Sequence, residues 1–147
     1  MSPGPTEVPP EVLAKGGIPV IHHRTPEYRK ILAEVHEGLK CVFQTQNDVL
    51  IFPAAGTGAM ESAVVNLCSP GDKVLAVSTG NFGDRWANIA EVYGLNVVKL
   101  QFEWGKSVDC TQVEAKLKAE PDIKVVYTTL SETSTGVEND IETLGRI

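Results

Sequence analysis

Three segments rich in glycine, serine and threonine hold the residues of this sequence best suited to bind a small polar ligand. They cover residues 53–58, 78–83 and 129–136, and each follows a short apolar run. Glycine lets the backbone approach a ligand closely, and hydroxyl groups donate and accept hydrogen bonds. If the apolar runs are strands of one parallel sheet, the three segments meet at its carboxyl edge, where such sheets bind ligands.

The first segment leads through Gly56-Thr57-Gly58 into a predicted helix. The free amides and positive dipole end of a helix favour an anion such as phosphate, and the Thr57 hydroxyl adds a donor. A tight turn without a ligand explains the same residues equally well. The sequence has no GxxxxGK[ST] motif, and Glu61 stands where GxGxxG requires its third glycine, so a P-loop is excluded and a dinucleotide site is weakly supported.

The other two segments offer an aromatic ring and hydroxyl groups. Phe82 lies between two glycines, where it could either stack on a flat heterocycle or belong to the core. Trp86 is more simply a core residue, and Arg85 either pairs with a carboxylate or is solvated. The serines and threonines of residues 131–135 suit a polar ligand, although ordinary loop and capping interactions explain them as well.

Metal and disulfide chemistry find little support. His22 and His23 are adjacent, but no nearby Cys, Asp or Glu completes a ligand set, so we expect no metal site. Cys41, Cys68 and Cys110 are odd in number and form no CxxC pair, which favours a reducing compartment.

Composition narrows the function classes further. Of the 147 residues, 42% are hydrophobic and 22% are charged, with a formal net charge of −6. The acidic balance argues against nucleic-acid or membrane-surface partners. The proline- and glycine-rich first twenty residues do not form a signal peptide, and no apolar run is long enough to span a bilayer. We expect a cytoplasmic protein.

Apolar runs and helical patterns alternate along the chain. This alternation predicts an α/β fold of three layers, α/β/α, with a mostly parallel sheet. Strands are predicted at residues 49–52, 73–77, 96–100 and 125–128, and helices near 9–16, 25–39, 59–67, 81–93 and 111–117.

Local signals set several of these boundaries. Thr25 is expected to cap the helix that starts at Pro26, and the Thr111–Glu114 segment has the form of a capping box. Residues 140–147 read as the opening turns of an amphipathic helix. We therefore expect this chain to be the N-terminal portion of a longer protein.

Taken together, the motifs resemble those of class V pyridoxal-phosphate-dependent aminotransferases, the group of the alanine–glyoxylate and serine–pyruvate enzymes. The GxFGxRW pattern and Glu-Thr-Ser-Thr-Gly are the most specific. The matching stretches are residues 3–10, 23–24, 55–61, 70–74, 80–86 and 132–136. The resemblance implies the large domain of the fold-type-I transferases, incomplete here, with residues 1–17 as an arm and short helix and residues 18–147 as part of the cofactor-binding domain.

The resemblance also implies roles for individual residues. The turn of Ala55, Gly56 and Thr57 would bind the phosphate of pyridoxal 5'-phosphate, with alanine where the family often has serine. Phe82 would stack on the pyridine ring, and Thr133 would bond near the ring hydroxyl. The region of Gly4 would lie near the substrate.

The family's anchoring lysine, the aspartate that pairs with the pyridine nitrogen and the arginine that binds the substrate carboxylate are all expected beyond residue 147. No catalytic residue is therefore expected in this chain, which we predict to be inactive alone. The implied reaction is transamination between an amino acid and a 2-oxo acid, with a homodimer as the complete protein. A related lyase, a cysteine desulfurase, a non-catalytic phosphate- or nucleotide-binding module and a chain completed by a separate polypeptide remain as alternatives.

Overall fold

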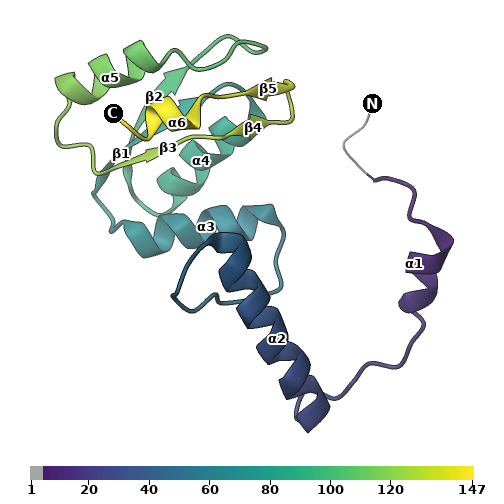
Figure 1. The fold of residues 1–147 in the computed structure, drawn as a ribbon. Coiled ribbons are helices and arrows are strands. Elements are labelled where there is room, and N and C mark those ends of the chain that lie inside the picture. The colour runs from purple at the N-terminus through teal and green to yellow at the C-terminus, as the bar shows by residue number, and fades with distance from the viewer. Residues whose placement is uncertain (1–4) are drawn as a thin grey trace. The chain divides into compact units, whose positions relative to one another are not determined.

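The computed structural model describes residues 5–147 and divides the chain into two compact units, Met1–Pro53 and Ala54–Ile147 (Figure 1). No helix within the described residues is both long and apolar enough to cross a membrane. The expected boundary between residues 17 and 18 stays a prediction about domain organisation.

The first unit contains the two helices that the sequence predicts. Helix α1 spans Pro10–Lys15 and helix α2 spans Pro26–Phe43. The Thr25 hydroxyl accepts a hydrogen bond from the Tyr28 amide at 3.3 Å. The expected cap at Thr25 is therefore confirmed.

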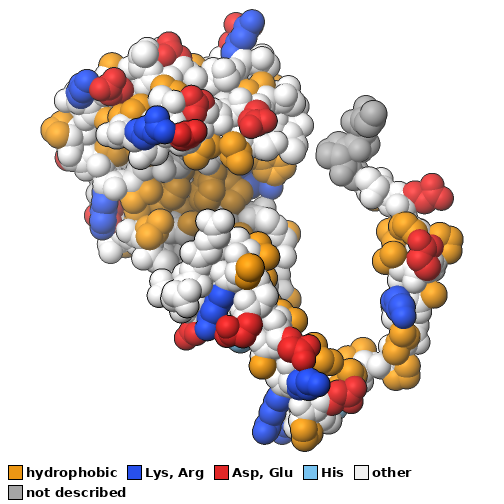
Figure 2. Space-filling model, in the orientation of Figure 1, with side chains coloured by type: hydrophobic (Ala, Val, Ile, Leu, Met, Phe, Trp, Pro, Cys, Tyr) orange, Lys and Arg blue, Asp and Glu red, His pale blue; other side chains and the backbone are white. Residues whose placement is uncertain are grey.

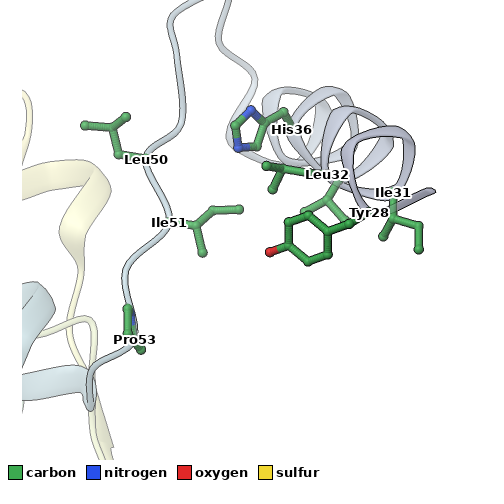
Figure 3. Close-up of a pocket in the computed structure, with 8 residues that line it drawn as sticks. Tyr28, Ile31, Leu32, His36, Leu50, Ile51 and Pro53 are labelled. Carbon is green, nitrogen blue, oxygen red and sulfur yellow. The ribbon is translucent and has the colours of Figure 1, made fainter. Parts of the chain in front are cut away.

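One face of α2 and the segment that follows it enclose an apolar hollow in the first unit. Its volume is about 600 Å³, and the side chains that line it come from α2 and from the segment ending at Pro53 (Figure 3). The strand predicted at residues 49–52 is absent, because within residues 5–147 no neighbouring strand pairs with this run. Leu50 is 85% exposed, so the run has the composition of a strand without the partner that a strand requires.

The second unit is built on a parallel sheet of three strands. Strands β1 (Lys73–Ser78), β2 (Asn96–Gln101) and β3 (Val125–Tyr127) lie in the order β2-β1-β3, with both pairings parallel. These strands confirm the predicted α/β class. The central strand β1 is buried on both faces, as its uninterrupted apolar sequence requires.

Helices cover both faces of this sheet, which makes the three predicted layers. Helices α3 (Gly56–Leu67) and α4 (Asn81–Val92) pack on the face of Val74, and α5 (Cys110–Ala119) packs on the face of Leu75. Neighbouring residues of a strand point to opposite faces, so β1 supplies both cores. The first core contains Val64, Val74, Ala90, Leu95 and Tyr127, and the second contains Leu75, Val77, Val108 and Val113.

After β3 the chain forms a short hairpin and a last helical turn. The antiparallel strands β4 (Ser131–Glu132) and β5 (Val137–Glu138) enclose the turn that contains Gly136, and α6 spans Ile141–Leu144. The capping box expected at Thr111 is wrong. Helix α5 begins at Cys110, and its N-cap is Asp109, two residues before Thr111; the Asp109 carboxylate accepts a hydrogen bond from the Thr111 amide at 2.9 Å.

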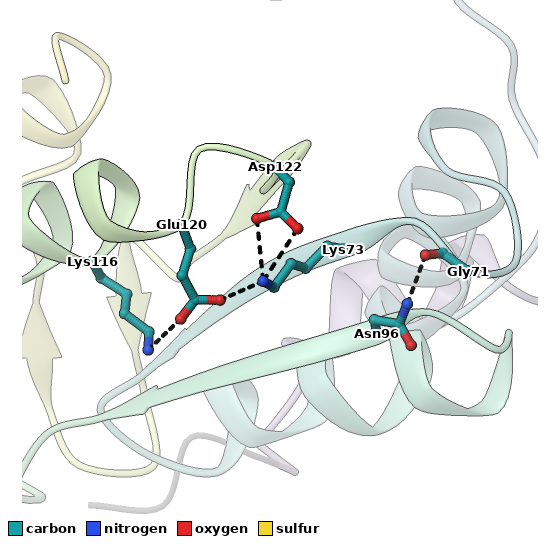
Figure 4. Close-up of polar contacts among 6 residues, drawn as sticks. All are labelled: Gly71, Lys73, Asn96, Lys116, Glu120 and Asp122. Carbon is teal, nitrogen blue, oxygen red and sulfur yellow. Dashed lines mark hydrogen bonds and ion pairs between the residues drawn. The ribbon is translucent and has the colours of Figure 1, made fainter.

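Ion pairs join the elements at the amino edge of the sheet. Lys73 Nζ lies 2.7 Å from Glu120 Oε2 and 3.1 Å from Asp122 Oδ1, and Lys116 Nζ lies 2.5 Å from Glu120 Oε1 (Figure 4). These contacts tie the start of β1 to the segment between α5 and β3. Elsewhere on the visible surface, charged side chains are scattered among hydrophobic ones (Figure 2).

The ion pairs predict how stability depends on pH. Lys116 and Lys73 lower the pKa of the Glu120 carboxyl, and Lys124 and the Ser69 amide lower that of Asp72. A carboxyl whose pKa is lower in the folded state stabilises the fold above its unfolded pKa, and that contribution is lost as pH falls through the folded pKa. The midpoint temperature of thermal unfolding should therefore be nearly constant around neutrality, and it should decrease when the pH is lowered below about 5.

Glu120→Gln should lower the midpoint at pH 7 and make its acid dependence shallower. The matched control is Glu103→Gln, which changes an exposed carboxyl that forms no ion pair within residues 5–147. Thermal unfolding followed by circular dichroism between pH 3 and 8 measures both variants. Superimposable pH profiles for Glu120→Gln and the unchanged chain would contradict this assignment.

Candidate functional site

The carboxyl ends of β1 and β3 open into a cavity in the second unit. The cavity has a volume of about 360 Å³ and is lined by Met60, Phe82, Trp86, Thr128, Thr129, Leu130, Ser131 and Thr133. Phe82 comes from the start of α4, and Thr133 from the hairpin turn. The structure thus brings together the aromatic ring and one of the hydroxyl groups that the sequence singled out.

The fully buried carboxylate of Glu132 connects the two loops that carry these residues. Its Oε2 accepts hydrogen bonds from the amides of Phe82 at 3.0 Å and Gly83 at 2.9 Å. Its Oε1 accepts from Ser134, through the amide at 3.2 Å and the hydroxyl at 2.5 Å. Helix α4 has no side-chain cap from its own flanking residue, so this distant carboxylate takes that place.

The Glu132 carboxylate has two consequences for the site. A negative charge at a helix N-terminus is stabilised by the free amides and the helix dipole, so the start of α4 is fixed in place. The amide of Phe82 donates to this carboxylate, and Thr133 follows Glu132 directly in the chain. The Glu132 carboxylate therefore fixes the positions of Phe82 and Thr133, which lie on two sides of the cavity. Sequence reasoning missed Glu132. The available signal was an acidic residue among hydroxyl residues in the loop that follows an apolar run.

Two glycines make this close approach possible. A Cβ atom at Gly83 would lie 2.5 Å from the Cα of Ser78, and one at Gly80 would lie 2.7 Å from the Cγ of Glu132. At Gly83 the neighbour is backbone, and at Gly80 it is the buried, hydrogen-bonded side chain of Glu132, so a Cβ at either position would require one of them to shift. The second glycine of this pair lets α4 start directly against the end of β1.

A second buried polar residue, Asn139, holds the same edge of the sheet. Its Nδ2 donates to the Thr129 carbonyl at 2.7 Å and to the Thr79 hydroxyl at 3.2 Å. Its Oδ1 accepts from the Val108 amide at 2.9 Å. Asn139 therefore joins the ends of β1 and β3 to the segment before α5, and it holds the backbone of Thr129, which lines the cavity.

Two aromatic rings line the cavity, and two of its threonines carry buried hydroxyl groups without a partner within the described residues. Trp86 stacks on Tyr127 with ring centroids 5.0 Å apart, so it belongs both to the core and to the cavity. Burial and the nearby Cys68 raise the pKa of Tyr127, which keeps its hydroxyl neutral. Within the described residues, the buried hydroxyl oxygens of Thr128 and Thr129 form no hydrogen bond, which is costly unless something else supplies one.

Ala55, Gly56 and Thr57 lie at the N-terminus of α3, beside the cavity rather than among the residues that line it. Ala55 is the N-cap residue and provides no side-chain hydrogen bond. The Thr57 hydroxyl oxygen accepts a hydrogen bond from Arg85 Nη1 at 3.0 Å. This contact connects the first glycine segment to the helix of Phe82. Within residues 5–147, Arg85 has a hydroxyl partner and forms no ion pair with a carboxylate.

Other residues considered in the sequence lie apart from this site. His22 and His23 belong to the first unit, where their rings stack with centroids 4.6 Å apart. No group of three or more potential metal ligands occurs among residues 5–147. Gly4 lies outside the described residues, so its expected contact with a substrate stays a prediction.

The chain is similar over its length to known aminotransferases. Residues 2–147 match the family described as Aminotransferase class-V. An uncharacterised aminotransferase of Methanocaldococcus jannaschii is 45% identical over 100% of this chain and 38% of its own length. The L-aspartate–glyoxylate aminotransferase of Paracoccus denitrificans is 41% identical over 98% of this chain and 37% of its own length.

A solved structure agrees with these sequence matches. The ureidoglycine–glyoxylate aminotransferase of Bacillus subtilis superimposes with a TM-score of 0.87 at 33% identity, covering 99% of this chain and 38% of that one. The chain belongs to the class V aminotransferase family, and the resemblance noted from its motifs is confirmed. It spans about 38% of the length of the relatives it matches.

The residues present fit the cofactor that the family implies. The aromatic ring of Phe82 lines the cavity and suits a pyridine ring, and the uncapped N-terminus of α3 beside it suits a phosphate. Phe82 and Thr133 would face the ring. Gly56 and Thr57 would face the phosphate, with Ala55 offering no side-chain donor.

The Glu132 network predicts a large effect on stability. Glu132→Ala should lower the free energy of unfolding by at least about 2 kcal/mol, because the amides of Phe82 and Gly83 lose their acceptor and a buried unpaired donor costs about 1–3 kcal/mol. Denaturant unfolding followed by circular dichroism measures the change.

The control is Glu138→Ala, which removes an exposed carboxylate from the neighbouring strand and should change the free energy of unfolding by no more than about 0.5 kcal/mol. Equal free energies of unfolding for the two variants would show that Glu132 is not the cap of α4.

Proposed function

We propose that this chain contributes the phosphate and ring side of a pyridoxal-phosphate site to an enzyme that transfers an amino group from an amino acid to a 2-oxo acid. The observation that carries the proposal is the cavity that joins Phe82 and Thr133 beside the N-terminus of α3. Family membership supports it, as do relatives whose names include glyoxylate. We propose, more finely, a reaction of the alanine–glyoxylate or serine–pyruvate type, in line with similar proteins named serine–glyoxylate and alanine–glyoxylate aminotransferase.

The residues of this chain would hold and orient the cofactor. The Phe82 ring would pack against the pyridine ring, and the Thr133 hydroxyl would bond near the ring hydroxyl. The amides at the start of α3 and the Thr57 hydroxyl would bind the phosphate. Trp86 lines the cavity and stacks on Tyr127, and this aromatic side would exclude water.

When bound, pyridoxal phosphate supplies an aldehyde that takes up the amino group and a ring that withdraws electrons. We propose that the lysine that anchors the cofactor and the groups that move protons lie outside residues 1–147. No lysine within residues 5–147 lines the cavity. The chain alone should therefore bind the cofactor weakly and reversibly and should not transaminate. A homodimer and a cytoplasmic location are part of the same proposal.

An absorbance titration of the purified chain with pyridoxal phosphate tests the proposal, followed by borohydride reduction and mass analysis. We expect saturable binding without a trapped adduct at any single lysine. Phe82→Ala should weaken binding about tenfold, since stacking on an aromatic ring contributes about 1 kcal/mol or more. Thr57→Ala should weaken it as well, because it removes a phosphate donor.

Phe43→Ala is the matched control, because it removes an exposed phenyl ring from the first unit. It should leave the affinity unchanged. Absence of any saturable binding would rule out a cofactor half-site in this chain. A stoichiometric adduct at one lysine would show instead that the chain anchors the cofactor itself.

A further inference from the structure

Arg85 holds together two parts of the site that are far apart in the sequence. Its Nη1 donates to the Thr57 hydroxyl oxygen at 3.0 Å, and its guanidinium carbon lies 4.9 Å from the centroid of the Phe82 ring. The guanidinium group therefore lies over the aromatic ring at the start of α4 while it reaches the first turn of α3. A cation over an aromatic face is attracted by the ring, which limits the positions that the guanidinium group can take.

The positive charge of Arg85 has no carboxylate partner in the part of the chain that the structure describes. Among residues 5–147, no carboxylate forms an ion pair with Arg85. The adjacent carboxylate of Asp84 is used elsewhere, where it accepts hydrogen bonds from Ser78 at 2.7 Å and Gln101 at 3.2 Å. A fixed cation is thus left beside the uncapped N-terminus of α3, where the helix dipole also favours an anion.

The hydrogen bond from Arg85 also determines what the Thr57 hydroxyl can do. A hydroxyl group has one hydrogen to donate and two lone pairs to accept with. Because Arg85 donates to the oxygen, the hydrogen of Thr57 is directed away from the guanidinium group and remains available to another acceptor. Without Arg85, that hydrogen could rotate and the oxygen could turn a lone pair toward the ligand instead.

We propose that Arg85 is a positioning residue for the phosphate end of the site, acting through Thr57. It orients the Thr57 hydroxyl as a donor toward a phosphate monoester and adds a positive charge nearby. The inference rests on the proposed function, and it makes Arg85 a determinant of selectivity for the phosphorylated form of the cofactor over the unphosphorylated form. A purely structural Arg85, which only joins α3 to α4, would affect both forms equally.

The test compares the affinities for pyridoxine 5'-phosphate and pyridoxine, which carry the same ring but no aldehyde to react with surface lysines. Isothermal titration calorimetry gives the ratio of the two affinities for the unchanged chain, Arg85→Gln, Arg85→Lys, Thr57→Val and the Arg85→Gln/Thr57→Val double variant. Circular dichroism confirms that each variant is folded. Arg146→Gln is the control, since it removes an exposed arginine of the same unit.

We expect Arg85→Gln to lower the affinity for pyridoxine 5'-phosphate about tenfold, as for the loss of one charge-assisted hydrogen bond, and to change that for pyridoxine by less than about twofold. Arg85→Lys should recover part of the ratio because it keeps the charge. The double variant should lose little more than Thr57→Val alone, because residues that act through one another are not additive. Arg146→Gln should leave the ratio unchanged.

Equal losses for both ligands in Arg85→Gln would overturn the proposal, and so would fully additive effects in the double variant. If Arg85→Gln does not fold, the ratio in Arg85→Lys decides, since that variant should fall between the unchanged chain and Thr57→Val. Failure of the unchanged chain to bind either ligand would instead refute the proposed function, and this inference with it.

Discussion

The buried carboxylate of Glu132 is the interaction on which the site depends. It accepts hydrogen bonds from the amides of Phe82 and Gly83 at the start of α4, and from Ser134 in its own hairpin. A buried carboxylate is costly unless it is fully hydrogen-bonded, and the free amides at a helix N-terminus supply that stabilisation. The same four hydrogen bonds therefore stabilise the helix and hold the aromatic ring beside the hairpin turn of Thr133.

Other contacts of the second unit hold the same two loops in position. The parallel sheet brings the carboxyl ends of β1 and β3 side by side, and the buried amide of Asn139 fixes both to the segment before α5. The absence of a side chain at Gly83 lets the helix begin against the end of β1. From that helix Arg85 reaches Thr57, so a single side chain connects the start of α3 to the Phe82 ring.

Much of the fold could be predicted because its signals are local. Apolar runs specified β1, β2 and β3, and Thr25 specified the start of α2. The strand predicted at residues 49–52 is wrong, because a strand needs a neighbouring strand to pair with, and a local sequence pattern does not show whether one is present. In the site, motif resemblance and the strand-end rule pointed to Phe82, Thr133 and the start of α3. The role of Glu132 and the contact of Arg85 with Thr57 could not be predicted from the sequence, because both connect residues that only the folded chain brings together.

The central claim is that one carboxylate makes the two loops a single site. The most direct test is a titration with pyridoxine 5'-phosphate, following the amide resonances of Phe82 and Thr133 in ¹⁵N-labelled chain and in Glu132→Gln. The account predicts that both resonances shift together with one dissociation constant in the unchanged chain, and that the variant loses this joint response while remaining folded. Unchanged shifts and affinity in Glu132→Gln would contradict it.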